Sequence, residues 1–530
     1  MSSLDPTVDI AVVGSGFAGS LMAMIAQRLG RSVILLERGV HPRFAIGESS
    51  TPLANLLLEE LARRYDLPRL LPLTKYGSWR RSYPDVACGL KRGFSFFHHK
   101  TGVPFADDAR HRRQLLVGAS PHDEIADTHW YRPDFDHFLV REAQAIGVEY
   151  ADQVNLRTFT SSGCGGLLQG DRRGMPVRVH ARLVIDATGP RGFLHRALAL
   201  HERALDGLPM MQSLFTHFTD VARFEDMAAD AFDTLPPFPV DAAAVHHLFD
   251  GGWIWILRFG NGITSAGVSA TDAFARELRL EEGAAAWERL LLRLPSVRAQ
   301  FEHARPVLGF MHLPRVSFGS GAITGPDWVM LPSAAGLIDP LLSTGFPLTL
   351  LGVGRLAEVL ENYWGSLRLA ERLQGYAEQT SHDLDTTARR VGARLLSLDD
   401  FESFTALALL YFAAASFAES ARRLGRPELA GSAFLLDDHP RFGPAARACV
   451  ARASGIRTAT ERDNLLADVM RAIVPVNVAG LGRPERRNWY PVYARDLLEA
   501  AEKLQADDAA IHALLQRTGF VSSSSANQRG

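Results

Sequence analysis

The chain has 530 residues, 47% of them hydrophobic, and a formal net charge of −2 at pH 7. This length predicts two or three lobes, and the balanced charge excludes a basic surface for nucleic acid or an anionic membrane. Three cysteines, at positions 88, 164 and 449, are too few for a disulfide framework and lack metal-ligand spacing, so no metal is expected. The N-terminus lacks a signal-peptide pattern and the longest apolar stretch, 405–418, is too short to span a bilayer, which predicts a cytoplasmic protein with no membrane contact.

The first residues predict a strand over 8–13, a glycine-rich turn and a helix over 20–29. Gly14 permits a tight turn, Gly16 lets a pyrophosphate approach the backbone, and Gly19 allows close packing of helix on strand. The helix N-terminus then offers free N–H groups and a positive dipole end to an anion.

A second strand is predicted over 32–36, and Glu37 stands at its end. Glu37 lies 18 residues past Gly19, where a carboxylate can accept hydrogen bonds from ribose hydroxyls. Strand, glycines, helix, strand and acid in this order predict a dinucleotide site. No second glycine fingerprint follows, so a bound NAD(P)H is not expected.

Three further segments in chain order attract attention. Pro52 starts a helix predicted over 53–65, and Glu48 just before it is either a carboxylate on the helix dipole or one at the edge of a cofactor. Residues 88–97 alternate as a strand that contains Lys91. An apolar strand over 182–189 ends in Ala-Thr-Gly, where a nucleotide-binding domain returns beneath its ligand.

The middle of the chain predicts a hairpin and a helix start. Trp253 and Trp255 lie on one face of a strand over 251–257, as an ordinary core feature or as a wall beside a cofactor. A turn at Asn261-Gly262 predicts a return strand. Residues 327–346 read as strand, donor-rich turn and the start of a helix that continues to about 360.

The remainder, from about 367 to 514, is rich in Ala, Leu and Arg and predicts helices. We expect a module over 1–360 with a substrate-sheet insertion at about 200–320, a helical substrate-covering region over 361–519, and a flexible tail over 520–530. Lysine occurs at only four of the 57 Lys and Arg positions. That scarcity, and the apolar strand around it, favour a chemical role for Lys91 over a surface charge, because lysine can become a neutral nucleophile and arginine cannot.

These motifs together resemble the flavin-dependent halogenases over most of the first 360 residues. The resemblance rests on the glycine turn, Gly47-Glu48-Ser49, Gly89-Leu90-Lys91, Trp253-Ile254-Trp255-Ile256 and Asp339-Pro340-Leu341-Leu342-Ser343-Thr344-Gly345. It implies an α/β fold: an FAD-binding Rossmann-like domain of the flavin monooxygenase and glutathione-reductase type, a β-sheet substrate lobe and a mostly helical C-terminal region.

The resemblance also implies a reaction. A separate NAD(P)H-dependent flavin reductase supplies reduced FAD, which reacts with O₂ to a C4a-hydroperoxide. Chloride or bromide is oxidised to hypohalous acid, which passes to Lys91 and then, as electrophilic halogen, to a small aromatic substrate that is free or tethered to a carrier protein. Such reactions belong to antibiotic and secondary-metabolite biosynthesis.

The implied residues fall into three groups. The cofactor-binding residues are Gly14, Gly16, Ala18, Gly19, Glu37, Arg38, Glu48, Ser49, Asp186, Gly189, Ser333 and Gly336. Ser343, Thr344 and Gly345 match the turn near the halide. Lys91, with Trp253 and Trp255 that keep the flavin from hydroxylating substrate directly, forms the catalytic group.

Departures from the family pattern predict the substrate branch. The tryptophan pair is followed by Leu257-Arg258 rather than Pro, Pro332-Ser333 replaces the usual Gly-Asp, and Leu342 replaces the Glu of tryptophan halogenases. We therefore expect a pyrrole or a phenol, rings that supply their own electron density, unless a carboxylate such as Asp134 or Asp136 replaces that Glu.

Three alternatives stay open. A flavin-dependent aromatic hydroxylase shares this fold and would transfer oxygen. An isoprenoid-type flavin reductase would suit the apolar helical region, and a non-enzymatic flavoprotein would bind FAD without turnover.

Overall fold

A mainly parallel sheet surrounds the first strand in the computed structural model, which describes residues 4–227, 236–453 and 455–520. In spatial order its parallel strands are β20 (Trp328–Met330), β10 (Met175–Asp186), β1 (Thr7–Val13), β2 (Val33–Leu36) and β7 (Glu149–Ala151). The central strands β1 and β2 are almost entirely buried, as expected where both faces of a parallel sheet are covered. An antiparallel extension, β8 (Val154–Ser161) and β9 (Gly166–Arg172), pairs with β10.

Two glycines fix the passage from β1 into helix α1 (Phe17–Arg28). Gly14 has a φ of +99°, and a Cβ there would lie 2.7 Å from the Ala187 oxygen. A Cβ on Gly19 would lie 1.9 Å from the Gly14 oxygen, so only glycine allows the helix this close to the turn. The expected order of strand, turn, helix and strand is confirmed, with the helix starting three residues earlier than predicted.

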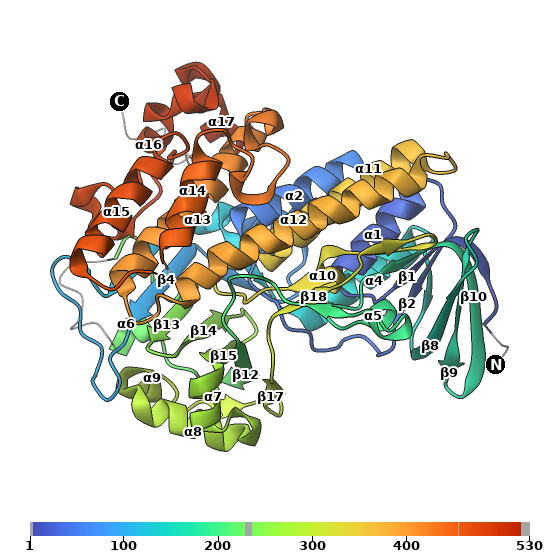
Figure 1. Ribbon diagram of the computed structural model, residues 1–530, viewed down its shortest axis with the longest axis horizontal. Coiled ribbons are helices and arrows are strands. Elements are labelled where there is room, and N and C mark those ends of the chain that lie inside the picture. Colours follow the sequence, from blue (N-terminus) through green and yellow to red (C-terminus); the bar gives the residue numbers. More distant parts are fainter. Residues whose placement is uncertain (1–3, 228–235, 454, 521–530) are drawn as a thin grey trace.

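The second sheet has nine strands and is largely antiparallel. In spatial order these are β16 (Arg305–Pro306), β12 (Met211–Thr219), β15 (Thr264–Thr271), β14 (Gly252–Arg258), β13 (Ala244–Phe249), β4 (Gly93–His98), β5 (Gln114–Gly118) and β22 (Trp489–Tyr490), with β17 (Met311–Leu313) also on β12. The hairpin of β14 and β15 confirms the turn predicted at Asn261-Gly262. Helices α7 (Asp272–Leu278), α8 (Ala284–Arg293) and α9 (Pro295–Gln300) lie below this sheet in Figure 1.

The single strand predicted over 88–97 is wrong, because the chain changes sheets at Arg92. Strand β3 (Cys88–Lys91) pairs with β6 (Asp127–Trp130) in a separate two-stranded sheet, whereas β4 belongs to the nine-stranded sheet. The Arg92 N–H donates to the Ala242 oxygen, outside both ladders. A Cβ on Gly93 would lie 2.1 Å from the Val117 oxygen, so the close crossing requires glycine. Lys91 is thereby the last residue of β3.

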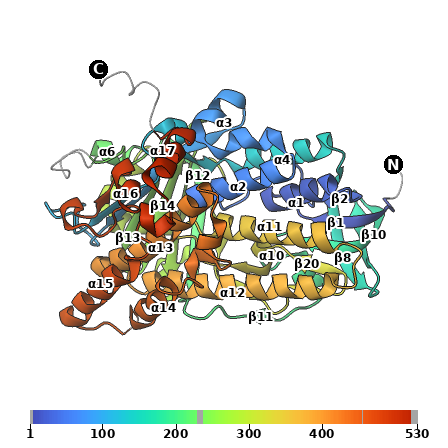
Figure 2. The ribbon, with the colours of Figure 1, turned by 90° about the horizontal axis from the view of Figure 1, so that it is seen from above.

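Helices cover the first sheet and extend beyond it. Besides α1 they are α2 (Pro52–Arg64), α3 (Tyr76–Ser82), α4 (Arg132–Ala145), α5 (Phe193–Ala197), α10 (Pro332–Ala335) and α11 (Gly345–Tyr363), whereas α6 (Phe224–Met227) packs beside α9 at the nine-stranded sheet. Thr51 caps α2 by accepting from the Ala54 N–H, with Pro52 in the first turn, as predicted. Figure 2 shows α11 beside the long helix α12 (Leu369–Leu395), which runs from the parallel sheet to the C-terminal helices.

The predicted helical C-terminal region is confirmed, with one addition. Its later helices are α13 (Phe401–Arg423), α14 (Phe442–Ala453), α15 (Ala459–Ile473), α16 (Ala494–Glu499) and α17 (Asp508–Arg517). The addition is β22, which pairs with β5 and joins this region to the nine-stranded sheet. The tail expected over 520–530 lies outside the described residues apart from Phe520.

Helix α13 extends the apolar stretch noted in the sequence to 23 residues. By length and composition it could cross a membrane, but 83% of its most apolar window is buried within this fold. Phe404, Leu407 and Ala414 on α13 are almost completely inaccessible to solvent. The helix therefore occupies the place of a core helix.

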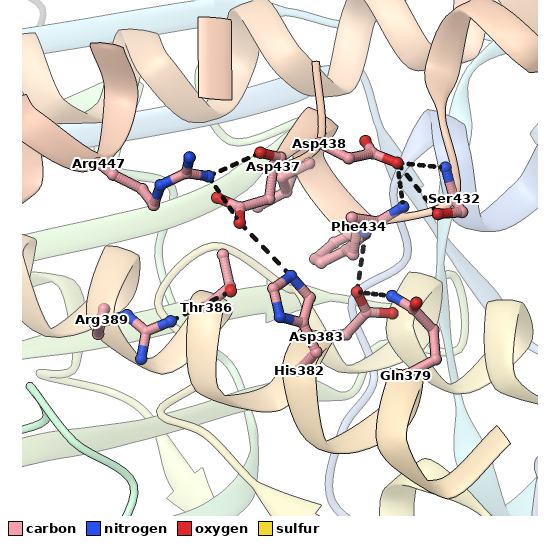
Figure 3. Close-up of polar contacts among 12 residues, drawn as sticks. Gln379, His382, Asp383, Thr386, Arg389, Ser432, Phe434, Asp437, Asp438 and Arg447 are labelled. Atoms are coloured by element: carbon pink, nitrogen blue, oxygen red, sulfur yellow. Dashed lines mark hydrogen bonds and ion pairs between the residues drawn. The ribbon is translucent and has the colours of Figure 1, made fainter. Parts of the chain in front are cut away.

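A polar cluster attaches α12 to the segment before α14 (Figure 3). Asp437 accepts hydrogen bonds from Arg390 and Arg447, and His382 lies 3.4 Å from its carboxylate. Asp383 on α12 accepts from the Phe434 N–H. Because buried charges are stable only when paired and hydrogen-bonded, these contacts fix how the segment meets α12.

Two neutral histidines lie in the core between the nine-stranded sheet and α7 to α9. His247 on β13 contacts His99 through one ring nitrogen at 2.9 Å and the Gln300 side chain through the other at 3.2 Å. Burial lowers the pKa of His247 to about 3 and that of His99 well below its ordinary value. Both rings therefore stay uncharged at neutral pH.

This burial predicts a loss of stability in mild acid. The unfolded chain binds a proton at His247 below a pH of about 6.5, while the folded chain does not until about 3, so stability falls as the pH drops through this window. For one histidine with these two pKa values, the free energy of unfolding falls by about 2 kcal/mol between pH 7 and pH 5. The substitution His247→Gln should reduce the difference between the free energies of urea unfolding at pH 7 and pH 5. The control His512→Gln, at an exposed histidine, should leave that difference unchanged. An equal pH dependence in all three proteins would contradict the assignment.

Candidate active site

A cavity of about 480 Å³ lies between the two sheets, and we call it the Trp-pair cavity. Its walls come from the N-terminus of α1, the segment 43–49, the loop after β10, strands β12 to β14, and the start of α11. Of the residues singled out in the sequence it is lined by Gly16, Ala18, Glu48, Ser49, Gly189, Trp253, Trp255, Ser333, Gly336, Ser343, Thr344 and Gly345. Folding thus gathers motifs that are more than 300 residues apart in sequence.

The glycine turn presents an anion-binding end to this cavity. The N-cap of α1 is Gly16, and neither a side-chain cap nor an acidic residue occupies the first turn. A Cβ on Gly16 would meet only side-chain ends, the nearest being an Arg132 nitrogen at 3.4 Å, so the protein's own packing does not demand glycine there. The open backbone, the helix dipole and the lining residues Arg43 and Arg132 fit a pyrophosphate.

Glu37 stands at the end of β2, as predicted, just outside the lining of the cavity. Its carboxylate accepts from the Ser15 N–H at 3.0 Å, the Ser15 hydroxyl at 2.8 Å and Arg43 at 3.1 Å. Burial alone would raise the pKa of Glu37, but Arg43 and the N–H groups of Gly39 and Ser15 lower it to about 2. The next residue, Arg38, is exposed and does not line the cavity.

Asp186 ends β10 and contacts its own loop rather than the cavity. It accepts from the N–H and hydroxyl of Thr188 and from the Leu194 N–H, which fixes the loop before α5. Gly189 in that loop has a φ of +83° and no atom within 4 Å of where its Cβ would stand, so it leaves open space toward the cavity.

The turn before α11 forms a second anion-friendly end. Thr344 is the N-cap of this 19-residue helix, with no side-chain cap and no acidic residue in the first turn. Ser343 has a φ of +54°, and a Cβ on Gly345 would meet nothing within 4 Å. Nearby, Asp339 accepts from Ser269 at 2.5 Å, and its burial raises its pKa to about 6. The turn can hold an anion such as halide through backbone N–H groups.

Glu48 is a buried carboxylate with one oxygen still unsatisfied. Its Oε1 lies 2.8 Å from His217 Nε2, while Oε2 has no hydrogen-bond partner in the part of the chain that the structure describes. A buried carboxylate oxygen without a donor is costly, and a ligand N–H or O–H in the cavity would remove that cost. This unpaired oxygen and the Gly16 turn together fit a dinucleotide whose polar ring system can donate a hydrogen bond, as that of FAD can.

Lys91 is fully buried, with 0% of its surface exposed. Its Nζ donates to the Ser49 hydroxyl at 2.8 Å and the Ser50 carbonyl at 2.5 Å, and lies 3.9 Å from the centre of the Phe94 ring. Burial lowers the pKa of the Lys91 amine, an effect that the opposite charge of Asp127 partly offsets. The amine is therefore closer to its neutral, nucleophilic form than a surface lysine is.

Main-chain pairing across three segments places Lys91. Strand β3 pairs with β6 so that Lys91 lies opposite Asp127 and Gly89 opposite His129. On the other edge of β6, Ser49 bridges to His129, and the Ser50 N–H and hydroxyl both donate to the Thr128 oxygen. The Gly47-Glu48-Ser49 motif and the lysine strand thereby meet across one shared strand.

Lys91 stands between the Trp-pair cavity and a second cavity of about 200 Å³, which we call the helix-covered cavity. Ser49, its hydrogen-bond partner, lines the first cavity, and Phe94, beneath its Nζ, lines the second. The wall of the helix-covered cavity includes Phe94, Ser120, Asp127, Tyr411, Phe412, Glu419, Tyr490 and Asp496. Strands β4 to β6, helix α13 and the C-terminal region thus enclose it.

Two residues beside Lys91 were missed in the sequence. His246 on β13 lines the Trp-pair cavity and lies 5.3 Å, ring to ring, from Trp253. Burial and the charge of Lys91 lower its pKa to about 3. Asp127 faces Lys91 across the ladder, and burial raises its pKa. No sequence spacing links either residue to Lys91, because strand pairing alone brings them together.

The tryptophan pair forms a wall of the Trp-pair cavity. Trp253 and Trp255 point to the same face of β14, as predicted, with ring centres 5.6 Å apart. The two residues that follow the tryptophan pair and depart from the family pattern have separate roles. Leu257 lines the cavity, and Arg258 forms an ion pair with Asp241 at 3.0 Å.

The carboxylates considered as replacements for the Glu of tryptophan halogenases are engaged elsewhere. Asp134 accepts from the Ala87 N–H, and Asp136 forms a buried pair with Arg132 at 2.8 Å. Neither lines a cavity of the site. Leu342, which stands where tryptophan halogenases have Glu, is completely buried and also lines neither cavity.

Comparison with known proteins finds similarity to halogenases. A tryptophan halogenase family model matches residues 127–390. The monodechloroaminopyrrolnitrin halogenase PrnC of Pseudomonas fluorescens is 30% identical over 375 residues, which cover 66% of this chain and 60% of that protein. The tetracycline 7-halogenase of Kitasatospora aureofaciens is 29% identical over 360 residues, covering 65% of this chain and 62% of that enzyme. The chain thus spans about three fifths of the length of these curated relatives.

Solved structures agree on the fold across nearly the whole chain. The halogenase PltM in complex with phloroglucinol and FAD superposes with a TM-score of 0.79, covering 91% of this chain and 99% of that one at 23% identity. The α/β fold of FAD-binding type, with its substrate sheet and helical C-terminal region, is therefore confirmed. By sequence the chain is similar to flavin-dependent halogenases, and its fold is the one that the halogenase PltM has.

Proposed function

We propose that the protein uses reduced FAD, O₂ and chloride or bromide to halogenate an electron-rich aromatic ring, a pyrrole or a phenol. The observation that carries the proposal is the buried Lys91 between two cavities, with Ser49 on one side and Phe94 on the other. This position suits a group that receives an oxidised halogen from one chamber and presents it to a substrate in the other.

The Trp-pair cavity is the proposed FAD site. The N-terminus of α1 at Gly16 would hold the pyrophosphate, Glu37 the ribose, and Glu48 a donor on the ring system. The N–H groups at Thr344 and Gly345 would hold the halide. When bound and reduced, FAD would supply with O₂ the oxidising power that converts halide to hypohalous acid. An NAD(P)H-dependent flavin reductase is the proposed transient partner.

The remaining chemistry belongs to the chain's own residues. Trp253 and Trp255 would form a wall on the cofactor side. The halogen would then reach a substrate ring in the helix-covered cavity through Lys91 and not directly from the flavin. As an ammonium, Lys91 can donate a hydrogen bond to hypohalous acid; as an amine, it can be halogenated itself. The neutral His129 and His246 beside it avoid adding positive charge next to the lysine.

The whole proposal is tested with the purified chain, FAD, a flavin reductase, NADH and either halide, with product masses read for phloroglucinol and a pyrrole. A halogen isotope pattern that depends on the added halide supports halogenation. A product heavier by one oxygen, independent of halide, would establish the hydroxylase instead.

Gly16→Val should abolish FAD binding, because the side chain would fill the space in front of the α1 N-terminus. Equilibrium titration followed by flavin fluorescence measures this directly. The control is Gly375→Val, at an exposed glycine of α12 whose Cβ would meet nothing within 4 Å. Wild-type affinity in the Gly16 variant would overturn the cofactor assignment.

Lys91→Ala and Lys91→Arg should both lose halogenated product while reduced flavin is still consumed at the wild-type rate. The lysine acts after the flavin step, and arginine keeps the charge but offers no accessible amine. Lys100→Ala, at an exposed lysine, serves as the control. Halogenation by either Lys91 variant at more than about one tenth of the wild-type rate would exclude the role.

Competition under one flavin supply should show turnover of pyrrolic and phenolic rings and little of free tryptophan. A six-membered indole carbon needs help in stabilising the cationic intermediate, and Leu342 offers none. Efficient halogenation of tryptophan on that ring, without turnover of pyrroles or phenols, would show that this interpretation of Leu342 is wrong.

A further inference from the structure

Asp127 is a buried carboxylate with one oxygen left unpaired inside the helix-covered cavity. Its Oδ1 accepts from Asn55 Nδ2 at 3.0 Å, and its Oδ2 has no hydrogen-bond partner among the described residues. The side chain is 6% exposed and lines the cavity. An unpaired carboxylate oxygen in such a place costs several kcal/mol unless a ligand or water donates to it. The structure thus holds an acceptor ready for a donor group in the cavity.

The lysine across the ladder does not use this oxygen. Lys91 lies directly opposite Asp127, where Cβ atoms of such pairs are typically about 5 Å apart. The Lys91 Nζ donates instead to Ser49 and Ser50, and among the ion pairs of the described residues none joins it to Asp127. Asp127 therefore lines the helix-covered cavity from the strand position opposite Lys91, the proposed halogen donor.

The other carboxylates on this cavity are already occupied. Glu419 accepts from Arg423 at 2.7 Å, and Asp496 holds both of its oxygens against Arg486 at 2.7 and 2.6 Å. The hydroxyl of Ser120, which also lines the cavity, lacks a partner, as the Asp127 oxygen does. Among the described lining residues, Asp127 is thus the carboxylate without an arginine partner, and it stands with the Ser120 hydroxyl in a wall that also holds the aromatic rings of Phe94 and Tyr411.

We infer that Asp127 binds the hydroxyl of a phenolic substrate and takes its proton while Lys91 delivers the halogen, so that the ring reacts as a phenolate. The inference rests on the proposed function and narrows its substrate class to phenols. It also accounts for Leu342 at the position where tryptophan halogenases have Glu, because the assisting carboxylate is supplied by strand β6 instead.

The step balances with hypochlorous acid as the halogen source. As the phenolic O–H proton passes to Asp127, the ring carbon bonds to chlorine and the Cl–O bond breaks. The hydroxide that leaves takes a proton from the Lys91 ammonium and departs as water. The dienone then loses its ring C–H proton to the Lys91 amine, and Asp127 returns its proton to the oxygen, which restores both residues and yields the chlorophenol.

The first test measures binding, without turnover, to the full chain loaded with oxidised FAD. Wild type should bind phloroglucinol about 10- to 100-fold more tightly than 1,3,5-trimethoxybenzene, which cannot donate a hydrogen bond. Asp127→Asn, which keeps the shape and the Asn55 contact, should erase that preference. The control Asp123→Asn removes a neighbouring carboxylate outside both cavities and should retain it. Equal wild-type affinities for the two probes would overturn the inference, whether or not the Asn variant folds.

The second test measures turnover with the same two probes and proteins. Asp127→Asn should lower kcat/KM for phloroglucinol by about 100-fold and change that for the ether by less than about twofold, because only the phenol has a proton to give. An equal loss for both probes, or none for either, would overturn the inference while wild-type turnover upholds the proposed function. If wild type halogenates neither probe, the proposed function fails, and the binding preference still decides whether Asp127 recognises phenols.

Discussion

The structure depends on keeping one lysine out of water. A buried ammonium is expensive, and Lys91 is stabilised by just two oxygen acceptors, a ring face and a carboxylate across the ladder. Those partners come from segment 48–50, β4 and β6, so segment 48–50 and β3 must both pair with β6 as observed for the charge to be tolerated. The same burial moves the amine toward its neutral form, which is the property a halogen carrier needs.

The two sheets divide the chemistry in space. The parallel sheet supplies open helix ends for anions, and the nine-stranded sheet supplies the aromatic wall of Trp253 and Trp255. Lys91 sits where the chain crosses from the small ladder to the large sheet, and Gly93 permits that crossing. In the proposed function, a reactive halogen species would be confined between a cofactor chamber and a substrate chamber, which limits its escape to water.

The helical C-terminal region completes the second chamber. Helix α13 contributes Tyr411 and Phe412 to the wall, and β22 extends the nine-stranded sheet from the far end of the chain. The polar cluster around Asp437 fixes the segment before α14 against α12, the long helix that reaches back to the parallel sheet.

The sequence by itself determined the glycine turn, the helix start at Pro52, the tryptophan hairpin and the resemblance to flavin-dependent halogenases, because these depend on local spacing and on residue types with few structural roles. It misjudged residues 88–97, since alternation cannot show that a strand changes sheets at Arg92. Asp127 and His246 beside Lys91, and the separate engagement of Asp134 and Asp136, were decided only by the tertiary structure. Cross-strand register and burial set which carboxylate lacks a partner, and neither quantity is encoded in the spacing of residues along the chain.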